Sequence, residues 1–156
     1  MYPTEIVDIA LPAEGVFHNL VFVSIRKTYP MQAYKIMHGL WGMGQMMFTK
    51  YLVVVDDDVD VHNTSEVLFR LCANTDPQRD STFVKSPCDA LDHAPTVPCI
   101  GSHMGLDATR KLPGEGLHPR LAGAGEDAGG SEGARGCAAW RGRWGFVKGP
   151  SFREPA

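Results

Sequence analysis

Length, composition and charge divide this chain into two unequal parts. The 156 residues carry 15 Lys/Arg and 18 Asp/Glu, a formal charge of −3, and 44% are apolar, which excludes a small disulfide-stapled scaffold. Through residue 116 the charge balance is 9 − 14 = −5, whereas residues 117–156 give 6 − 4 = +2 and hold nine of the 17 glycines. We therefore expect an acidic domain over residues 1–116 and a disordered, Gly/Ala/Arg-rich tail over residues 117–156.

The same counts disfavour membrane, secreted and nucleic-acid-binding proteins. No stretch approaches the roughly 18 to 20 apolar residues of a membrane span, and the N-terminus lacks the pattern of a secretory signal. The four cysteines show no Cys-x-x-Cys spacing, which favours reduced thiols and a cytoplasmic location. Mild acidity argues against nucleic acid as a partner; the tail's Arg141, Arg143 and Lys148, set among aromatic residues, leave RNA binding as a weak alternative.

The first half of the chain alternates strand and helix patterns. Residues 18–27 contain a nearly continuous apolar run, which predicts a buried strand, and Tyr29-Pro30 ends it. From residue 31 to residue 48 the apolar positions follow the three-four spacing of a helix with one buried face. Residues 51–55 are the strongest strand signal, and they end abruptly at three aspartates.

A second helix and a third strand follow. Asn63 is a candidate N-cap with Glu66 three residues later, and Pro77 places the end of the helix near residue 74. Residues 80–85 predict a short strand, and residues 86–116 show little regular pattern. This order predicts an α/β fold: a three-layer-like arrangement in which helices flank a mixed, partly parallel sheet, followed by an irregular C-terminal segment.

The aspartates after the strongest strand are the first candidate for chemistry. Asp56, Asp58 and Asp60 resemble the start of a calcium loop, but Val61 and Val67 stand where that loop requires glycine and glutamate. Magnesium ligation is the alternative that the pattern leaves open. We favour a structural role in which these carboxylates accept hydrogen bonds from backbone N–H groups of a turn, and we assign no metal ligands.

No complete catalytic motif is present. The six histidines lack zinc spacing, and residues 101–105 resemble a phosphate-binding loop only loosely. Met43, Met46 and Met47 beside Trp41 form a Met-rich segment, which is typical of core or of a subunit interface. From residue spacing alone, no catalytic residue is assigned.

Several ordered motifs nevertheless resemble the C-terminal domain of UbiD-type decarboxylases. They are Leu11-Pro-Ala-Glu-Gly-Val-Phe-His-Asn-Leu20, Trp41-Gly-Met-Gly-Gln-Met-Met-Phe-Thr-Lys50, Val53-Val-Val-Asp-Asp-Asp-Val-Asp60, Asp76-Pro77 with Arg79-Asp80, Leu91-Asp92-His93 and Gly101-Ser-His-Met-Gly-Leu-Asp-Ala-Thr-Arg-Lys111. The resemblance covers nearly everything through residue 116. It is greatest to the quinone-biosynthesis branch, particularly the menaquinone decarboxylases.

The resemblance implies an enzyme: a carboxy-lyase that decarboxylates an aromatic or α,β-unsaturated acid in menaquinone or ubiquinone biosynthesis. Such enzymes use prenylated FMN and a divalent metal, and their catalytic Glu-Arg-Glu set and metal ligands lie upstream of this domain. We therefore expect a fragment that is inactive alone, binds neither group and has no catalytic residue. Its partner would be the missing flavin-binding domain, or a second copy through the Met-rich helix. The alternative is a non-catalytic interaction or oligomerisation module.

The resemblance also implies two sets of site residues. The substrate-cleft candidates are Asp89, Leu91, Asp92 and His93, and the candidates near the cofactor are Gly44, Gln45, Lys50 and His103. In some relatives a basic residue stands near the place of Gly44, and a lysine commonly replaces His103. Residues 104–111 are read as a packed crossover at least as readily as a catalytic segment.

The tail departs from the family pattern. Family members usually continue Gly-Glu-Gly with Phe-Thr-Arg-x-Trp-Pro, whereas this chain continues with residues 117–122. One choice of codons for those six residues, read in the neighbouring frame, encodes Phe-Thr-Arg-Ala-Trp-Pro. We interpret residues 117–156 as the product of a reading-frame shift, which the nucleotide sequence would test.

Overall fold

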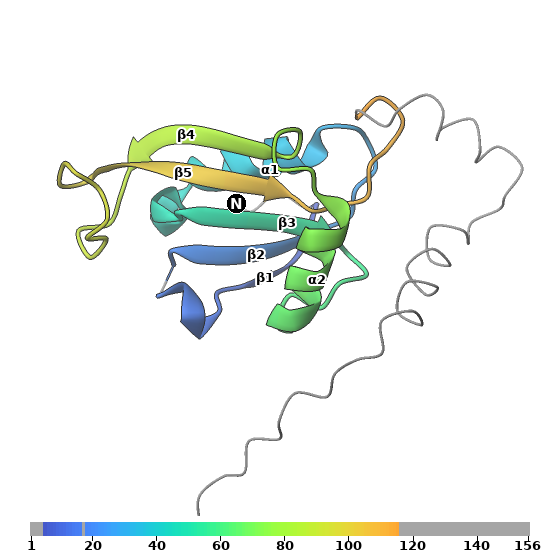
Figure 1. The fold of residues 1–156 in the computed structure, drawn as a ribbon, viewed down its shortest axis with the longest axis horizontal. Helices are drawn as coiled ribbons and strands as arrows, with labels where there is room; N and C mark the ends of the chain where they lie inside the picture. The colour runs from blue at the N-terminus through green and yellow to red at the C-terminus, as the bar shows by residue number, and fades with distance from the viewer. Residues whose placement is uncertain (1–4, 17, 116–156) are drawn as a thin grey trace, which may run out of the picture. The chain divides into compact units, whose positions relative to one another are not determined.

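A five-stranded mixed sheet with helices on its two faces forms the domain. The computed structural model describes residues 5–16 and 18–115. The expectations for the tail, including disorder, the shifted frame and RNA binding, lie outside these residues. In chain order the elements are β1 (Ile6–Ala10), a 3-10 turn η1 (Ala13–Gly15), β2 (Leu20–Ile25), α1 (Gln32–Trp41), a 3-10 turn η2 (Gly44–Phe48), β3 (Tyr51–Asp56), α2 (Thr64–Asn74), β4 (Ser81–Pro87) and β5 (Ile100–Asp107) (Figure 1).

The sheet has the order β1-β2-β3-β5-β4. Its three inner strands β2, β3 and β5 are parallel, and the edge strands β1 and β4 run antiparallel to their neighbours. The register pairs Val23 with Val54 and Val53 with Leu106. The predicted α/β fold with a mixed, partly parallel sheet is therefore confirmed.

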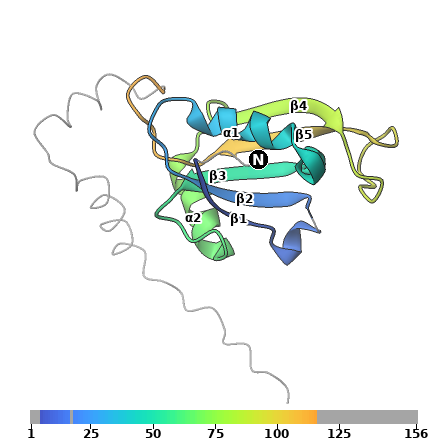
Figure 2. The ribbon, with the colours of Figure 1, turned by 180° about the vertical axis from the view of Figure 1, so that it is seen from behind.

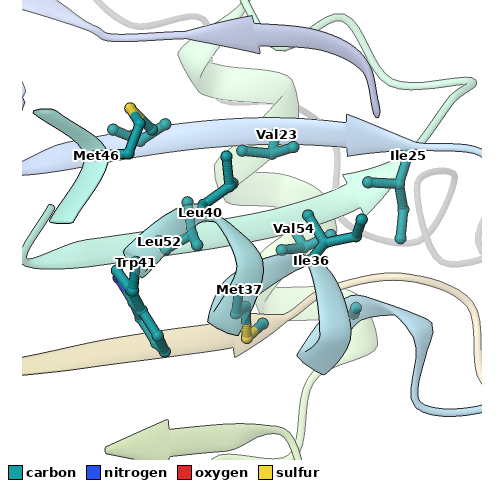
Figure 3. Close-up of a cluster of buried hydrophobic side chains, with 11 residues drawn as sticks. Val23, Ile25, Ile36, Met37, Leu40, Trp41, Met46, Leu52 and Val54 are labelled. Carbon is teal, nitrogen blue, oxygen red and sulfur yellow. The ribbon is translucent and has the colours of Figure 1, made fainter. Parts of the chain in front are cut away.

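Helix α1 covers one face of the sheet. Alternate residues of β2 and β3, such as Val23 and Val54, pack against Ile36, Met37 and Leu40 of α1, and all five side chains are fully buried (Figure 3). Complete burial of such a side chain contributes about 1.5–3 kcal/mol relative to an exposed one. This face holds the larger of the two apolar clusters because α1 lies along the parallel strands.

The opposite face is covered by α2. Phe22, Val53 and Val55 point to this side, as the two-residue period of a strand requires, and pack with Val67 of α2. The predicted N-cap is confirmed, because the Asn63 side chain accepts a hydrogen bond from the Glu66 N–H at 3.4 Å. Figure 1 shows α2 in front of the sheet, and Figure 2, seen from the opposite side, shows α1 in front of it. The domain therefore has three layers: a helix, the sheet and a second helix.

The helix expected over residues 31–48 is wrong in length. Helix α1 ends at Trp41, and the chain then forms the separate turn η2. Gly44, the first residue of η2, has φ +47°, a left-handed conformation that an α-helix cannot accommodate. Within the Met-rich segment Met46 is buried in the core, whereas Met47 is 36% exposed.

The expectation of little regular structure over residues 86–116 is also wrong, because β5 occupies its centre. Residues 101–105 therefore belong to a strand and not to a phosphate-binding loop, and residues 104–107 are not a crossover. Gly105 is needed for packing, since a Cβ there would lie 2.5 Å from the Met37 Sδ atom. Hydrogen bonding to strands on both sides stabilises β5 although its own sequence is poor in β-branched residues.

The sequence pattern also missed β1. This edge strand has only five residues, and its register shifts between Ile6 and Asp8. A short strand with an irregular register does not produce a clear alternation of apolar residues. No helix in residues 5–16 and 18–115 is long and apolar enough to cross a membrane.

Candidate functional site

An open cavity of about 540 Å³ lies where β3 and β5 begin and β4 ends. The loop of residues 88–99, which joins β4 to β5 and projects from one end of the sheet, forms another wall (Figure 1). The cavity is at the amino ends of the parallel strands, opposite to the carboxyl edge where ligands commonly bind in α/β sheets. Its lining residues are Lys50, Tyr51, Phe83, Lys85, Asp92, Ala94, Pro95, Thr96, Val97, Ile100, Gly101, Ser102, His103 and Met104.

An ion pair joins the loop to the start of β3. The Lys50 Nζ atom lies 2.9 Å from Asp92 Oδ1, and only 8% of the Asp92 side chain is exposed. The same carboxylate oxygen accepts a hydrogen bond from the Ala94 N–H at 3.1 Å. The Lys50 ammonium is the main cause that holds the pKa of Asp92 below its ordinary value. Asp92 is therefore a carboxylate at neutral pH, and it positions Lys50 at the cavity.

His103 forms part of the cavity wall from within β5. The residue is 1% exposed, its ring centroid lies 5.5 Å from that of Trp41, and its Nε2 atom is 3.2 Å from the Pro87 carbonyl oxygen. Burial lowers the pKa of His103, so the ring is neutral at pH 7 and Nε2 can donate to that carbonyl. Its Nδ1 atom has no hydrogen-bond partner among the described residues.

Four exposed apolar side chains lie on β4, β5 and the loop between them, and we call Phe83, Leu91, Val97 and Ile100 the apolar rim. All of them except Leu91 line the cavity. These side chains are 69%, 73%, 49% and 63% exposed, respectively. Of these four residues, Leu91 alone is among the site residues predicted from the sequence. The exposure of Phe83 could have been considered from the sequence, because Phe83 and Val84 are neighbours in a strand and therefore point to opposite faces of the sheet.

The sequence-predicted site residues separate into two groups. Lys50, Asp92 and His103 all line the cavity. The other five do not line it: Asp89, Leu91, His93, Gly44 and Gln45. Among these, Asp89 lies 3.5 Å from the Nε2 atom of His18, and Gly44 and Gln45 are exposed on η2. Their assignment to the cleft or the cofactor stays a prediction.

The aspartates at the carboxyl end of β3 have structural partners. Asp56 accepts a hydrogen bond from the Arg110 N–H at 2.7 Å and pairs with its side chain at 3.1 Å, while Asp60 accepts one from the His62 N–H at 2.9 Å. Among the contacts of the described residues, the one made by Asp60 is the predicted turn contact, whereas Asp56 binds Arg110 from a distant segment and Asp58 pairs with Arg70 of α2 at 3.1 Å. The described part of the chain contains no group of three or more His, Cys, Asp or Glu residues arranged to hold a metal.

A buried ionic cluster, which no local sequence pattern indicates, holds the segment after β5 in place. Lys27 has no exposed side-chain surface and lies 2.7 Å from Glu115 and 3.7 Å from Asp107. Lys111 bridges Asp107 at 3.0 Å and Asp80 at 3.2 Å. Each charged group of the cluster has a partner of opposite charge, so the cluster joins distant segments of the chain. We therefore assign it a structural role and no part in catalysis.

Comparison with known proteins identifies the family of this domain. The family described as 3-octaprenyl-4-hydroxybenzoate carboxy-lyase C-terminal domain matches residues 1–108. An uncharacterised protein of Archaeoglobus fulgidus is 50% identical over 117 residues, which cover 74% of this chain and 24% of that protein. One of Aquifex aeolicus is 48% identical over 112 residues, covering 72% of this chain and 23% of that protein.

Solved structures share the fold. The UbiD-class enzyme HmfF from Pelotomaculum thermopropionicum, in complex with FMN, superimposes with a TM-score of 0.64 at 24% identity, covering 73% of this chain and 26% of HmfF. Vanillic acid decarboxylase of Sedimentibacter hydroxybenzoicus, in its closed form, gives a TM-score of 0.67 at 24% identity, covering 87% of this chain and 28% of that enzyme.

The chain thus spans about a quarter of the length of the relatives it matches. The family match extends from the first residue through the end of β5, and the sheet order and both helices belong to that span. This chain belongs to the UbiD decarboxylase family, of which it comprises the C-terminal domain.

Proposed function

We propose that this domain supplies one wall of the active-site cleft of a UbiD-type carboxy-lyase. The proposed reaction is decarboxylation of an aromatic or α,β-unsaturated acid in menaquinone or ubiquinone biosynthesis, in the cytoplasm. The carrying observation is the cavity at the amino ends of β3 and β5, where two lysines and exposed aromatic surface lie together. This combination suits an aromatic acid, because the ring would contact Phe83 while the carboxylate is attracted by cations.

The charges at the cavity are arranged for an anion. Lys50 is held by Asp92, whereas Lys85 lines the same cavity and has no ion-pair partner among the described residues. A carboxylate or phosphate would be attracted by both ammonium groups. His103 also lines the cavity, but its buried ring is neutral and adds no charge there.

The cofactor of the family fits this arrangement only in part. When bound, prenylated FMN supplies the electrophilic centre for decarboxylation, and Lys50 and Lys85 are the residues here that would face an anionic part of substrate or cofactor. The divalent metal has no matching ligand set in the part of the chain that the structure describes. We therefore assign the metal and the catalytic acid to the remaining three quarters of the family's length, and expect this chain alone to be inactive.

A chimeric enzyme tests the proposal. Residues 1–116 of this chain would replace the matching segment of the 50% identical Archaeoglobus fulgidus relative, produced with prenylated FMN. We expect both the chimera and the unmodified relative to release carbon dioxide from the same member of a panel of 4-hydroxybenzoate-type and cinnamate-type acids. The isolated chain should release none.

Matched variants test whether the cavity contributes to substrate binding. In the chimera, replacing both Lys50 and Lys85 by Met should raise KM, whereas Lys35→Met, whose ion pair with Glu5 lies outside the cavity, should leave it unchanged. Activity of the isolated chain would contradict the expected dependence on the missing domain. An unchanged KM in the double variant would contradict a role of the cavity lysines in binding the substrate.

The second candidate function is a non-catalytic interaction module, which the apolar rim favours. Phe83, Leu91 and Ile100 are large, exposed side chains on β4, β5 and the loop between them, and such exposure is typical of a contact surface. We propose the flavin-binding domain as its partner, with a second copy as the other candidate, through the rim or the exposed Met47 of the Met-rich segment. An upstream open reading frame encoding the missing domain would favour a split enzyme; its absence, together with tight self-association, would favour the module.

A further inference from the structure

We propose that Cys88 and Cys99 form a redox-sensitive pair. Reaction with a low-molecular-weight disulfide would join the two thiols and close the loop of residues 88–99 at its base. This assignment is independent of the proposed decarboxylase function. It rests on strand register, on the conformation of Cys99 and on the contrast in exposure between the two thiols.

The register of the β4–β5 hairpin brings the two cysteines opposite each other. The last strand pair is Pro87 with Ile100, so the next pair outward is Cys88 with Cys99. The Cys88 N–H donates a hydrogen bond to the Cys99 carbonyl oxygen at 3.2 Å, which continues the ladder by one step. Opposite residues in such a pair have Cα atoms about 4.5–5.5 Å apart, inside the range of about 4.4–6.8 Å that a disulfide spans.

Cys99 occupies a backbone position that ordinarily favours glycine. The Ile100 N–H donates to the Val97 carbonyl oxygen at 3.2 Å, which closes a four-residue turn with Pro98 second and Cys99 third. Cys99 has φ +61°, as the third residue of a type II turn requires. The presence of a cysteine at this strained position, opposite another cysteine, points to a role of its thiol.

The two thiols differ in their surroundings. Cys99 is exposed, whereas Cys88 is 6% exposed and packs beside Gly101. Burial raises the pKa of the Cys88 thiol, and the neighbouring Asp92 and Cys99 raise it further. Cys99 is therefore the thiol that reacts first with a reagent in solution.

The reaction proceeds in two exchanges. The Cys99 thiolate attacks one sulfur of the small disulfide, forms a mixed disulfide and releases one small thiol. The Cys88 thiolate then attacks the Cys99 sulfur, forms the internal disulfide and releases the second small thiol. The small disulfide is reduced to two thiols while the protein dithiol is oxidised, and the two protein protons pass to the released thiolates.

Closing this loop affects the cavity directly. The loop carries Asp92, which pairs with Lys50, and it supplies Pro95 and Val97 to the cavity wall. A bond between the two ends of the loop reduces the conformations open to all residues between them. The disulfide would therefore restrict the wall that contains Asp92.

The test uses the full chain carrying Cys72→Ser and Cys137→Ser, which leaves only the proposed pair. After treatment with oxidised glutathione, we expect loss of both titratable thiols, a mass decrease of two hydrogens and a linked peptide containing residues 88 and 99. Dithiothreitol should restore both thiols. Chymotryptic cleavage after Leu91 should be slower in the oxidised than in the reduced protein.

Two single variants in this background complete the experiment. Cys99→Gly suits the positive φ and should fold well, but should neither lose mass nor change its cleavage rate upon oxidation. Cys88→Ala should stop at the mixed disulfide on Cys99. A glutathione adduct that persists on Cys99 while Cys88 is intact, or a cleavage rate unaffected by oxidation, would overturn the proposal.

Discussion

At the residue scale, the environment of each side chain in the cavity decides what it can do. Lys50 and Asp92 are 42 positions apart in sequence, yet they form a 2.9 Å ion pair, which joins the β4–β5 loop to the start of β3. His103 shows the opposite case, since burial keeps its ring neutral. Both properties lead to measurable pH effects.

Removing the ammonium of Lys50 should change the titration of Asp92. In Lys50→Met the pKa of Asp92 should rise towards its ordinary value, because the main cause of its lowering is lost. Carboxyl NMR titration measures this shift directly. Lys85→Met is the matched control, since Lys85 lines the same cavity without contacting Asp92; an equal shift there would contradict the role of the ion pair.

His103 should make stability fall as the solution becomes acidic. Its folded-state pKa is lowered, so the unfolded chain binds a proton first, at about pH 6.5, and the free energy of unfolding decreases as pH falls through that value. Urea denaturation at pH 7 and at pH 5 should show a smaller difference in His103→Gln than in the parent chain. An identical pH dependence in both would show that the ring is not buried as a neutral group.

At the element scale, close packing between α1 and the sheet depends on one glycine, and the segment after β5 depends on buried charge. Gly105 lets α1 approach the sheet, and Glu115 accepts hydrogen bonds from the Met31 and Leu112 N–H groups, each at 2.7 Å. The contacts of Gly105 with Met37 and of Glu115 with Met31 join residues that are far apart in the chain.

Gly105→Ala should destabilise the domain by about 1–3 kcal/mol, the usual cost of overpacking a core. The added methyl would lie 2.5 Å from Met37 Sδ and 3.0 Å from the Trp41 ring, so buried side chains must move. Gly39→Ala, within α1, meets nothing within 4 Å and should stabilise the helix by about 0.5–1 kcal/mol. Chemical denaturation would compare the two, and equal effects would contradict the packing argument.

Glu115→Gln should cost about 3 kcal/mol in the free energy of unfolding, because Lys27 would stay buried with only Asp107 at 3.7 Å as a charged partner. Although burial alone would raise it, the pKa of Glu115 is lowered by Lys27 and two backbone N–H groups. The stabilisation is therefore present above about pH 4.3 and is lost as pH falls through the lower folded-state value. The exposed Glu14→Gln should change stability by less than about 0.5 kcal/mol.

At the scale of the whole molecule, the apolar rim leaves several large apolar side chains of the domain exposed. Phe83 and Ile100 come from β4 and β5, so the rim is presented by the rigid sheet as well as by the loop. The relatives are about four times as long as the matched segment, and we propose that the rim contacts another part of such a longer protein.

The isolated chain should associate with itself through this rim. Sedimentation velocity should show concentration-dependent association, and the double substitution Phe83→Ser with Ile100→Ser should weaken it at least several-fold, because apolar area drives such contacts. Val7→Ser removes a side chain that is 51% exposed outside the rim and should have little effect. Equal association of all three proteins would place the contact elsewhere.

Local sequence pattern by itself determined a large part of this protein. The apolar runs of β2 and β3, the Asn63 cap of α2 and the ordered family motifs are readable because neighbouring residues alone create the signal. Tertiary structure decided the rest. Strand β5 is stabilised by its two neighbours despite a sequence with two glycines, and Lys50–Asp92 and Cys88–Cys99 meet only through loop geometry and strand register. Such contacts join residues distant in sequence, so no periodicity within one segment can reveal them.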